Sequence, residues 1–209
     1  MSIIKIKKEE VSPIILLMMM FFCIVGSSIT GASARDTFFL TQFDRSLLPL
    51  MFALVAGLMV VVISIYNKMT SNLDLVKTII FSSVFFCITL FIIRFKLNGF
   101  VIPLFYAWTD VIISITIFQF WLLASEIFNP RQAKRLFSVI GIGGSVAGIS
   151  AGYLMRPFVS QFGAENLLIP TIIFIALIGV FAILLNPFRA KKDNDIREKT
   201  KNETSKNIF

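Results

Sequence analysis

The sequence predicts an all-α membrane protein with six transmembrane helices, and three observations carry this prediction. The chain has 209 residues, of which 56% are hydrophobic and only 15% are charged, whereas a soluble domain carries about 25% charged residues. Its apolar residues fall into six long runs with few or no charges. These runs do not alternate polar with apolar residues, which excludes the strands of a β-barrel. Within lipid the backbone N–H and C=O groups of each run must then hydrogen-bond within the run itself, which requires a helix.

The bounds of the spans follow from the charges. A helix needs about 20 apolar residues to cross the hydrocarbon core, and the charge-free runs place spans near residues 11–34, 47–67, 77–94, 100–127, 136–155 and 167–187. They form one domain, residues 11–188, between an N-terminal segment 1–10 and a basic tail 189–209. The tail is poor in apolar residues, which predicts a disordered end that is either solvated or in contact with anionic lipid.

The first run has a competing interpretation as a signal peptide. Basic residues, an apolar run and then Ala32-Ser33-Ala34 resemble a cleavage site. The uncharged run from Val11 to Ala34 is 24 residues, longer than the roughly 7–15 residues of a signal peptide's apolar region. Cleavage would also leave five spans, so we expect the first span to be retained.

The basic residues predict the orientation. With the N-terminus inside, 15 of the 20 Lys and Arg residues fall on inner segments, which the positive-inside rule favours. We expect a multi-pass protein of a bacterial inner membrane with both termini cytoplasmic. The net charge of +8 then requires no nucleic-acid partner. Arg131, Lys134 and Arg135 are assigned to an inner loop.

The six spans repeat a pattern of three. Spans one and four carry the polar groups, two and five carry small residues, and three and six are dominated by Phe, Ile, Leu and Val. Paired three-helix repeats of this kind build each half of a major-facilitator-type transporter. The expected fold is therefore six transmembrane helices as two three-helix repeats, with membrane lipid as surroundings.

Asp110 is the sharpest candidate for function. A carboxylate in mid-span costs about 2.5–3.5 kcal/mol, so it must face water, pair with a cation or be protonated. Helical periodicity places it on one stripe with Ser114, Ile117 and Trp121, and with Ser125 nearby. This stripe is a candidate cavity wall; the alternative is a purely structural ion pair.

Three further charges lie near the ends of spans. Arg35 and Asp36 either mark the membrane surface or lie on a longer helix, in which case Arg35 faces Asp110. Arginine is well suited to holding phosphate or carboxylate. Glu126, just before Asn129-Pro130, is either functional or an interfacial partner of Arg131 or Arg135.

The fifth span is rich in glycine. Gly144, Gly148 and Gly152 are four residues apart, which predicts a groove where another helix comes close. The surrounding pattern lacks the third glycine of a dinucleotide loop and the Lys of a phosphate loop. The chain also contains no histidine, so a histidine-based triad is excluded. We expect no enzyme, no catalytic residue, no cofactor and no metal.

Several of these segments resemble the ATP/ADP translocase family of nucleotide transporters. The resemblance runs from about Gly31 to Leu154, and its most specific block lies in residues 119–137. The segments that carry it are Ser33 to Thr41, Leu47-Leu48-Pro49, Trp108-Thr109-Asp110, Phe120-Trp121, Ala124-Ser125, Gln132-Ala133-Lys134-Arg135 and Gly141-Ile142-Gly143-Gly144.

The resemblance implies nucleotide exchange across a membrane. The family's charged first-helix position matches Arg35 or Asp36, and its acidic fourth-helix position resembles Asp110, with Trp108 and Glu126 added as candidate substrate residues. Arg35 stands where the family usually has Lys, and Asp110 stands for Glu. Members have about twelve spans, so a second six-helix half, in the same chain or a partner, is the expected complement.

Two functions from different classes follow. The first is a secondary transporter, or its N-terminal half, that moves nucleotides or another anionic metabolite by alternating access. It predicts that Arg35 and Asp110 face a central cavity. The second is a non-transporting membrane module or the remnant of a transporter, which predicts that Asp110 pairs internally without an aqueous cavity.

Overall fold

The computed structural model describes residues 8–70, 73–96 and 99–206, and this part of the chain is built from helices. Six of them are long and apolar enough to cross a membrane. They are α1 (Lys8–Gln42), α2 (Leu48–Thr70), α3 (Leu75–Phe95), α4 (Val101–Ile127), α5 (Pro130–Phe162) and α6 (Leu168–Lys206). Short 3-10 turns, η1 (Arg45–Leu47) and η2 (Ala164–Leu167), precede α2 and α6. The all-helical class and the six long apolar helices are confirmed for the described residues.

The helices extend beyond the expected spans. α1 continues to Gln42, α5 begins at Pro130 and ends at Phe162, and α6 continues through Lys206 into the segment expected to be disordered. A charge-free run marks the thickness of the hydrocarbon core and not the end of a helix, because Lys, Arg and Glu are good helix formers. Residues 1–7 and 207–209, in the expected terminal segments, lie outside the described residues.

Local sequence sets several helix ends. Asp74 caps α3 by accepting hydrogen bonds from the backbone N–H groups of Val76 and Lys77. Asn129 and Gln132 form a capping box at the start of α5, with Pro130 in its first turn. Gly163 ends α5 at φ 81°, a conformation that glycine adopts without strain.

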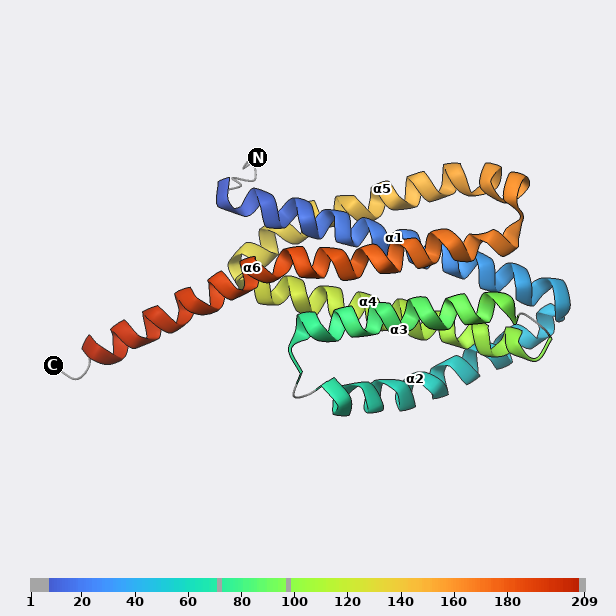
Figure 1. The fold of residues 1–209 in the computed structure, drawn as a ribbon, viewed down its shortest axis with the longest axis horizontal. Coiled ribbons are helices and arrows are strands. Elements are labelled where there is room, and N and C mark those ends of the chain that lie inside the picture. Colours follow the sequence, from blue (N-terminus) through green and yellow to red (C-terminus); the bar gives the residue numbers. More distant parts are fainter. Residues whose placement is uncertain (1–7, 71–72, 97–98, 207–209) are drawn as a thin grey trace.

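α1 and α4 occupy the centre of the bundle. α1 packs against α4, α5 and α6, while α2 packs against α4, and α3 packs against α6. Figure 1 shows α5 and α2 at opposite edges, with α1, α6, α3 and α4 between them. Side chains on the two central helices therefore have the most protein around them, and α2 is the least buried span.

The polar side chains of α1 are largely satisfied within the helix. Ser27 and Ser28 donate to the carbonyl of Ile24, and Thr30 donates to that of Gly26 at 2.9 Å. Thr30 also shares a hydrogen bond of 2.8 Å with Thr171 on α6. Hydroxyls that bond the preceding turn are tolerated inside a membrane, so the polarity of this span does not by itself indicate a cavity.

Candidate functional site

Arg35 lies inside α1, about two turns before its end at Gln42. The helix continues past Arg35 and Asp36 because apolar residues follow, and because Thr37 and Thr41 bond back to the carbonyls of Ser33 and Phe38 at 2.7 and 3.0 Å. Of the two interpretations of Arg35, the structure shows the longer helix.

The guanidinium of Arg35 forms an ion pair with the carboxylate of Asp110 on α4. It also lies 3.2 Å from the carboxylate of Asp36 and 4.4 Å above the ring of Tyr106. The Arg35 side chain is only 12% exposed, that of Asp110 is 23% exposed, and that of Asp36 is 49% exposed. A cation within about 6 Å of an aromatic centroid is attracted to the ring face. These four side chains, the α1–α4 charge cluster, form the candidate site.

The cluster has more acid than base. One guanidinium faces two carboxylates, and an arginine is charged at all physiological pH values. Because the carboxylates of Asp36 and Asp110 are partly exposed, another anion could take the place of either one beside the guanidinium of Arg35. The arrangement therefore suits the exchange of a protein carboxylate for an anionic ligand at Arg35.

The stripe that begins at Asp110 lies on a partly exposed face of α4. Ser114, Ile117 and Trp121 are partly or fully exposed, whereas Gln119 and Phe120 between them are buried. Ser114 also lines a cleft of about 190 Å³ against Ile63 and Tyr66 of α2. Ser125 is exposed and donates to the carbonyl of Leu122 at 2.7 Å. This face of α4 is thus only partly covered by the described helices, since Trp121 meets the rings of Phe21 on α1 and Phe137 on α5.

Trp108 does not join the cluster. Its indole N–H donates to the hydroxyl of Thr89 on α3 at 3.0 Å, and its ring meets those of Phe85 and Phe86 edge to face. Two residues along a helix correspond to about 200° of rotation, so Trp108 and Asp110 point to different sides of α4. Trp108 therefore packs between α3 and α4 and lies outside the α1–α4 charge cluster.

Glu126 pairs with a residue that the sequence argument did not consider. Its carboxylate lies 2.5 Å from Arg189 of α6, which also lies 2.5 Å from Asp74 at the N-cap of α3. Arg135 instead pairs with the buried Glu10 of α1 at 2.7 Å. The expected partners Arg131 and Arg135 are therefore wrong for Glu126. Two separate ion-pair groups join helices at this end of the bundle.

The Asp74–Arg189–Glu126 group ties three helices together. Asp74 lies just before α3, outside the spans, and its hydrogen bond with Arg189 holds its pKa below the ordinary value of 3.8. Backbone N–H groups of Lys77 and Val76 act in the same direction, while partial burial opposes them. The carboxylate is thus charged at neutral pH.

Residues 131, 134 and 135, which were expected in an inner loop, are helical. α5 begins at Pro130, so they belong to its first two turns and not to a loop. Arg131 and Lys134 are exposed, while Arg135 is half-buried against Glu10. Each has the charge expected of a membrane-surface residue.

The glycine contact of α5 is shifted from the expected positions. A Cβ on Gly143 would overlap the carbonyl oxygen of Met18 on α1, and one on Gly144 would lie 2.6 Å from the ring of Phe21. At Gly148 and Gly152 a Cβ would meet nothing within 4 Å. The close approach predicted for Gly144 is present, but those at Gly148 and Gly152 are not.

Some functional candidates were missed by the sequence argument. Tyr106 lies one helical turn before Asp110, and this spacing was a signal that it shares a face with the carboxylate. Gln119 is buried and bonds both Tyr66 on α2 and Ser82 on α3, at 2.8 Å each. Its polarity was visible in the sequence, but its partners depend on how the helices pack.

Comparison with family models, with curated proteins and with solved structures finds no match.

Proposed function

We propose that the chain is the six-helix unit of a secondary transporter for an anionic metabolite, with a nucleotide as the expected substrate. The observation that carries the proposal is the pairing of Arg35 with Asp110 on the two central helices. Charged residues at membrane depth are rare and mark substrate or ion pathways. The ATP/ADP-translocase resemblance of residues 31–154 supports the nucleotide.

The chemistry of the α1–α4 charge cluster suits exchange. A phosphate approaching Arg35 competes with Asp110 for the same guanidinium, and bidentate arginine–phosphate pairs are strong. When the phosphate binds, Asp110 loses its cation, and a cation from solution takes the place of the guanidinium. Release of the substrate restores the Arg35–Asp110 pair. Binding and release thereby alter a contact between two helices, which is what alternating access requires.

The order of helix contacts supports a repeat of three helices. α5 packs on α1 as α2 packs on α4, and α3 packs on α6. Exchanging the first three helices with the last three leaves this pattern unchanged, as expected for the paired repeats of transporter halves. In this proposal a second six-helix half covers the partly exposed face of α4 that carries Asp110 and Ser114.

The test is transport by the protein in its native full length. Cells or liposomes that carry it are supplied with labelled ATP, ADP, inorganic phosphate or a dicarboxylate, and uptake is followed with Arg35→Ala and with Arg45→Ala. Arg45 is an exposed arginine in η1 and serves as the matched control. Loss of uptake only in Arg35→Ala supports the proposal. Undiminished uptake in that variant removes Arg35 from the mechanism.

A second candidate function is a non-transporting membrane module. The observation that favours it is that Asp110 has an internal cationic partner, so a structural ion pair explains its presence at this depth. Absence of uptake of every anion tested, with the protein correctly inserted, would favour this candidate. Thiol labelling of Ser114→Cys and Ser125→Cys distinguishes it further, because a helix interface without water does not label.

A further inference from the structure

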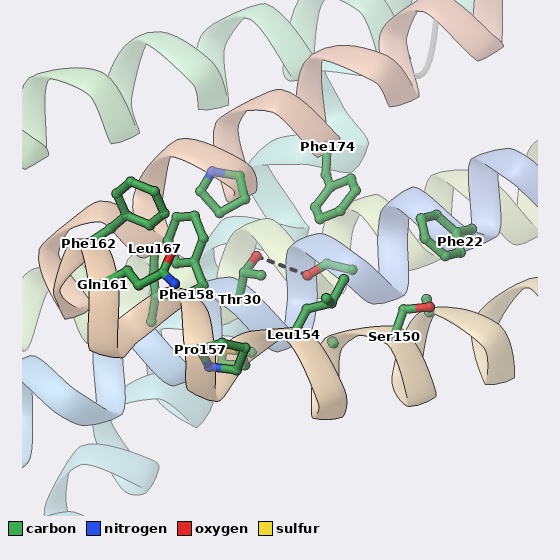
Figure 2. Close-up of a pocket in the computed structure, with 15 residues that line it drawn as sticks. Phe22, Thr30, Ser150, Leu154, Pro157, Phe158, Gln161, Phe162, Leu167 and Phe174 are labelled. Carbon is green, nitrogen blue, oxygen red and sulfur yellow. Dashed lines mark hydrogen bonds between the residues drawn. The ribbon is translucent and has the colours of Figure 1, made fainter.

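A second feature, independent of the charge cluster, is an apolar cleft between α1, α5 and α6. It has a volume of about 400 Å³. Figure 2 shows Phe22 at one end and Gln161, Phe162 and Leu167 at the other. Its wall on α5 runs from Ala147 to Phe162, which corresponds to about 22 Å of helix.

The cleft exists because α1 and α5 separate along their length. They are in contact where Gly143 approaches the backbone of Met18. One turn further along α5, Ala147, Ser150 and Ala151 line the cleft. Small side chains on this stretch leave the space open.

The hydroxyl on the α1 wall is hydrogen-bonded within the protein and needs no polar partner from a ligand. The Thr30 hydroxyl lies within hydrogen-bond distance of the carbonyl of Gly26, drawn as the dashed line in Figure 2, and of the Thr171 hydroxyl. The Thr171 hydroxyl in turn lies 2.9 Å from the carbonyl of Leu167. Because these two hydroxyls find partners within the protein, the α1 wall favours an apolar occupant.

The α5 wall of the cleft is about as long as one lipid leaflet is thick. Its lining residues lie within three candidate spans, apart from Leu167 in the turn before α6. A bilayer with its headgroups is about 40–45 Å thick, so one leaflet is about 20–22 Å, close to the length of the α5 wall. Gln161 is one residue from the end of α5 and is exposed, whereas Phe22 lies deep in α1. One end of the cleft thus carries an exposed polar side chain, and the other end is apolar.

We propose that this cleft holds one acyl chain of a membrane phospholipid, with the headgroup at the Gln161 end. Inside a bilayer the solvent that reaches a lateral apolar opening is lipid. Filling the space restores the dispersion contacts that an empty cavity would forfeit. The bound chain would then pack α1, α5 and α6 together beyond the point where the helices touch.

Native mass spectrometry of the purified full chain, loaded with one defined phospholipid, tests the proposal. Ala151→Phe places a ring in the cleft, and Ala56→Phe makes the same change at an exposed position of α2. We expect Ala151→Phe to lose one tightly retained lipid per chain and Ala56→Phe to retain it. Equal retention in both variants would overturn the proposal.

A photoreactive phospholipid with a diazirine on its acyl chain gives a second readout that does not require a variant. We expect crosslinks concentrated on residues 147–162 of α5 and 22–30 of α1, and reduced by excess unlabelled lipid. Labelling spread evenly over the exposed faces of all the helices, with no competition, would show annular lipid only and would contradict a specific site. Circular dichroism of Ala151→Phe establishes that a lost lipid does not reflect a lost fold.

Discussion

Arg35 on α1 and Asp110 on α4 form an ion pair between the two central helices of the bundle. Both side chains are mostly buried, and the ring of Tyr106 covers one face of the guanidinium. The pair thus brings opposite charges together where either alone would be costly.

The pair predicts that the effects of its two single substitutions on stability are not additive. Arg35→Met leaves the carboxylate of Asp110 without its cation, and Asp110→Leu leaves the guanidinium with Asp36 alone. Each single change should destabilise the fold by about 1–3 kcal/mol or more, because a buried charged group loses its partner. Thermal unfolding in detergent measures this. The double variant should be less destabilised than the sum of the two, and strict additivity would show that the pair is not coupled.

The helix contact at Gly143 predicts a position-specific packing defect. Gly143→Ala places a methyl group against the backbone of Met18, so α1 and α5 must move apart. Overpacking of this kind costs about 1–3 kcal/mol. Gly148→Ala adds the same group where nothing lies within 4 Å, and should leave stability unchanged or raise it slightly through helix propensity. Equal melting temperatures for the two variants would contradict the described contact.

The Asp74–Arg189–Glu126 group predicts a dependence of stability on acid. Pairing lowers the pKa of Asp74 in the folded protein. The contribution of this carboxylate to the free energy of unfolding is therefore fully present above the ordinary pKa of 3.8, and it is lost as the pH falls through the lower pKa of the folded protein. The free energy of unfolding, measured between neutral pH and about pH 3, should fall with this loss. In Asp74→Asn the fall in stability over the same pH range should be smaller.

Comparison of two substitutions separates the charge of Asp74 from its capping role. Asn still caps a helix, so Asp74→Asn removes only the ion pair with Arg189. Asp74→Ala removes the cap as well and should cost a further 0.5–2 kcal/mol or so. Identical stabilities of the Asn and Ala variants at neutral pH would argue against a capping role.

The sequence predicted the helices better than their contacts. Hydrophobic length alone identifies six spans, because lipid requires each to be a helix of sufficient reach. It did not predict that α1 continues to Gln42, since adjacent charges at residues 35 and 36 also occur where a helix leaves the membrane. The pairing of Arg35 with Asp110 depends on that extension, so only one of the two interpretations included it.

The spacing of residues along the sequence does not predict contacts between helices that are distant in the chain. The regular spacing of Gly144, Gly148 and Gly152 predicts a common face, but a crossing between helices touches only part of a face, and α5 leaves α1 after Ala147. The one other charge on the helix of Glu126 is Asp110, 16 residues away, and its partner Arg189 lies on α6. Neither outcome follows from local sequence.

We propose that water reaches the face of α4 that carries Asp110. The most direct test is the reaction of a water-borne, membrane-impermeant thiol reagent with Ser114→Cys in the full-length protein, after replacement of Cys23 and Cys87. Ile88→Cys, exposed on α3, serves as the lipid-facing control. We expect that Ser114→Cys reacts, that ATP slows its reaction, and that Ile88→Cys stays unlabelled. A Ser114→Cys that reacts no faster than Ile88→Cys would contradict it.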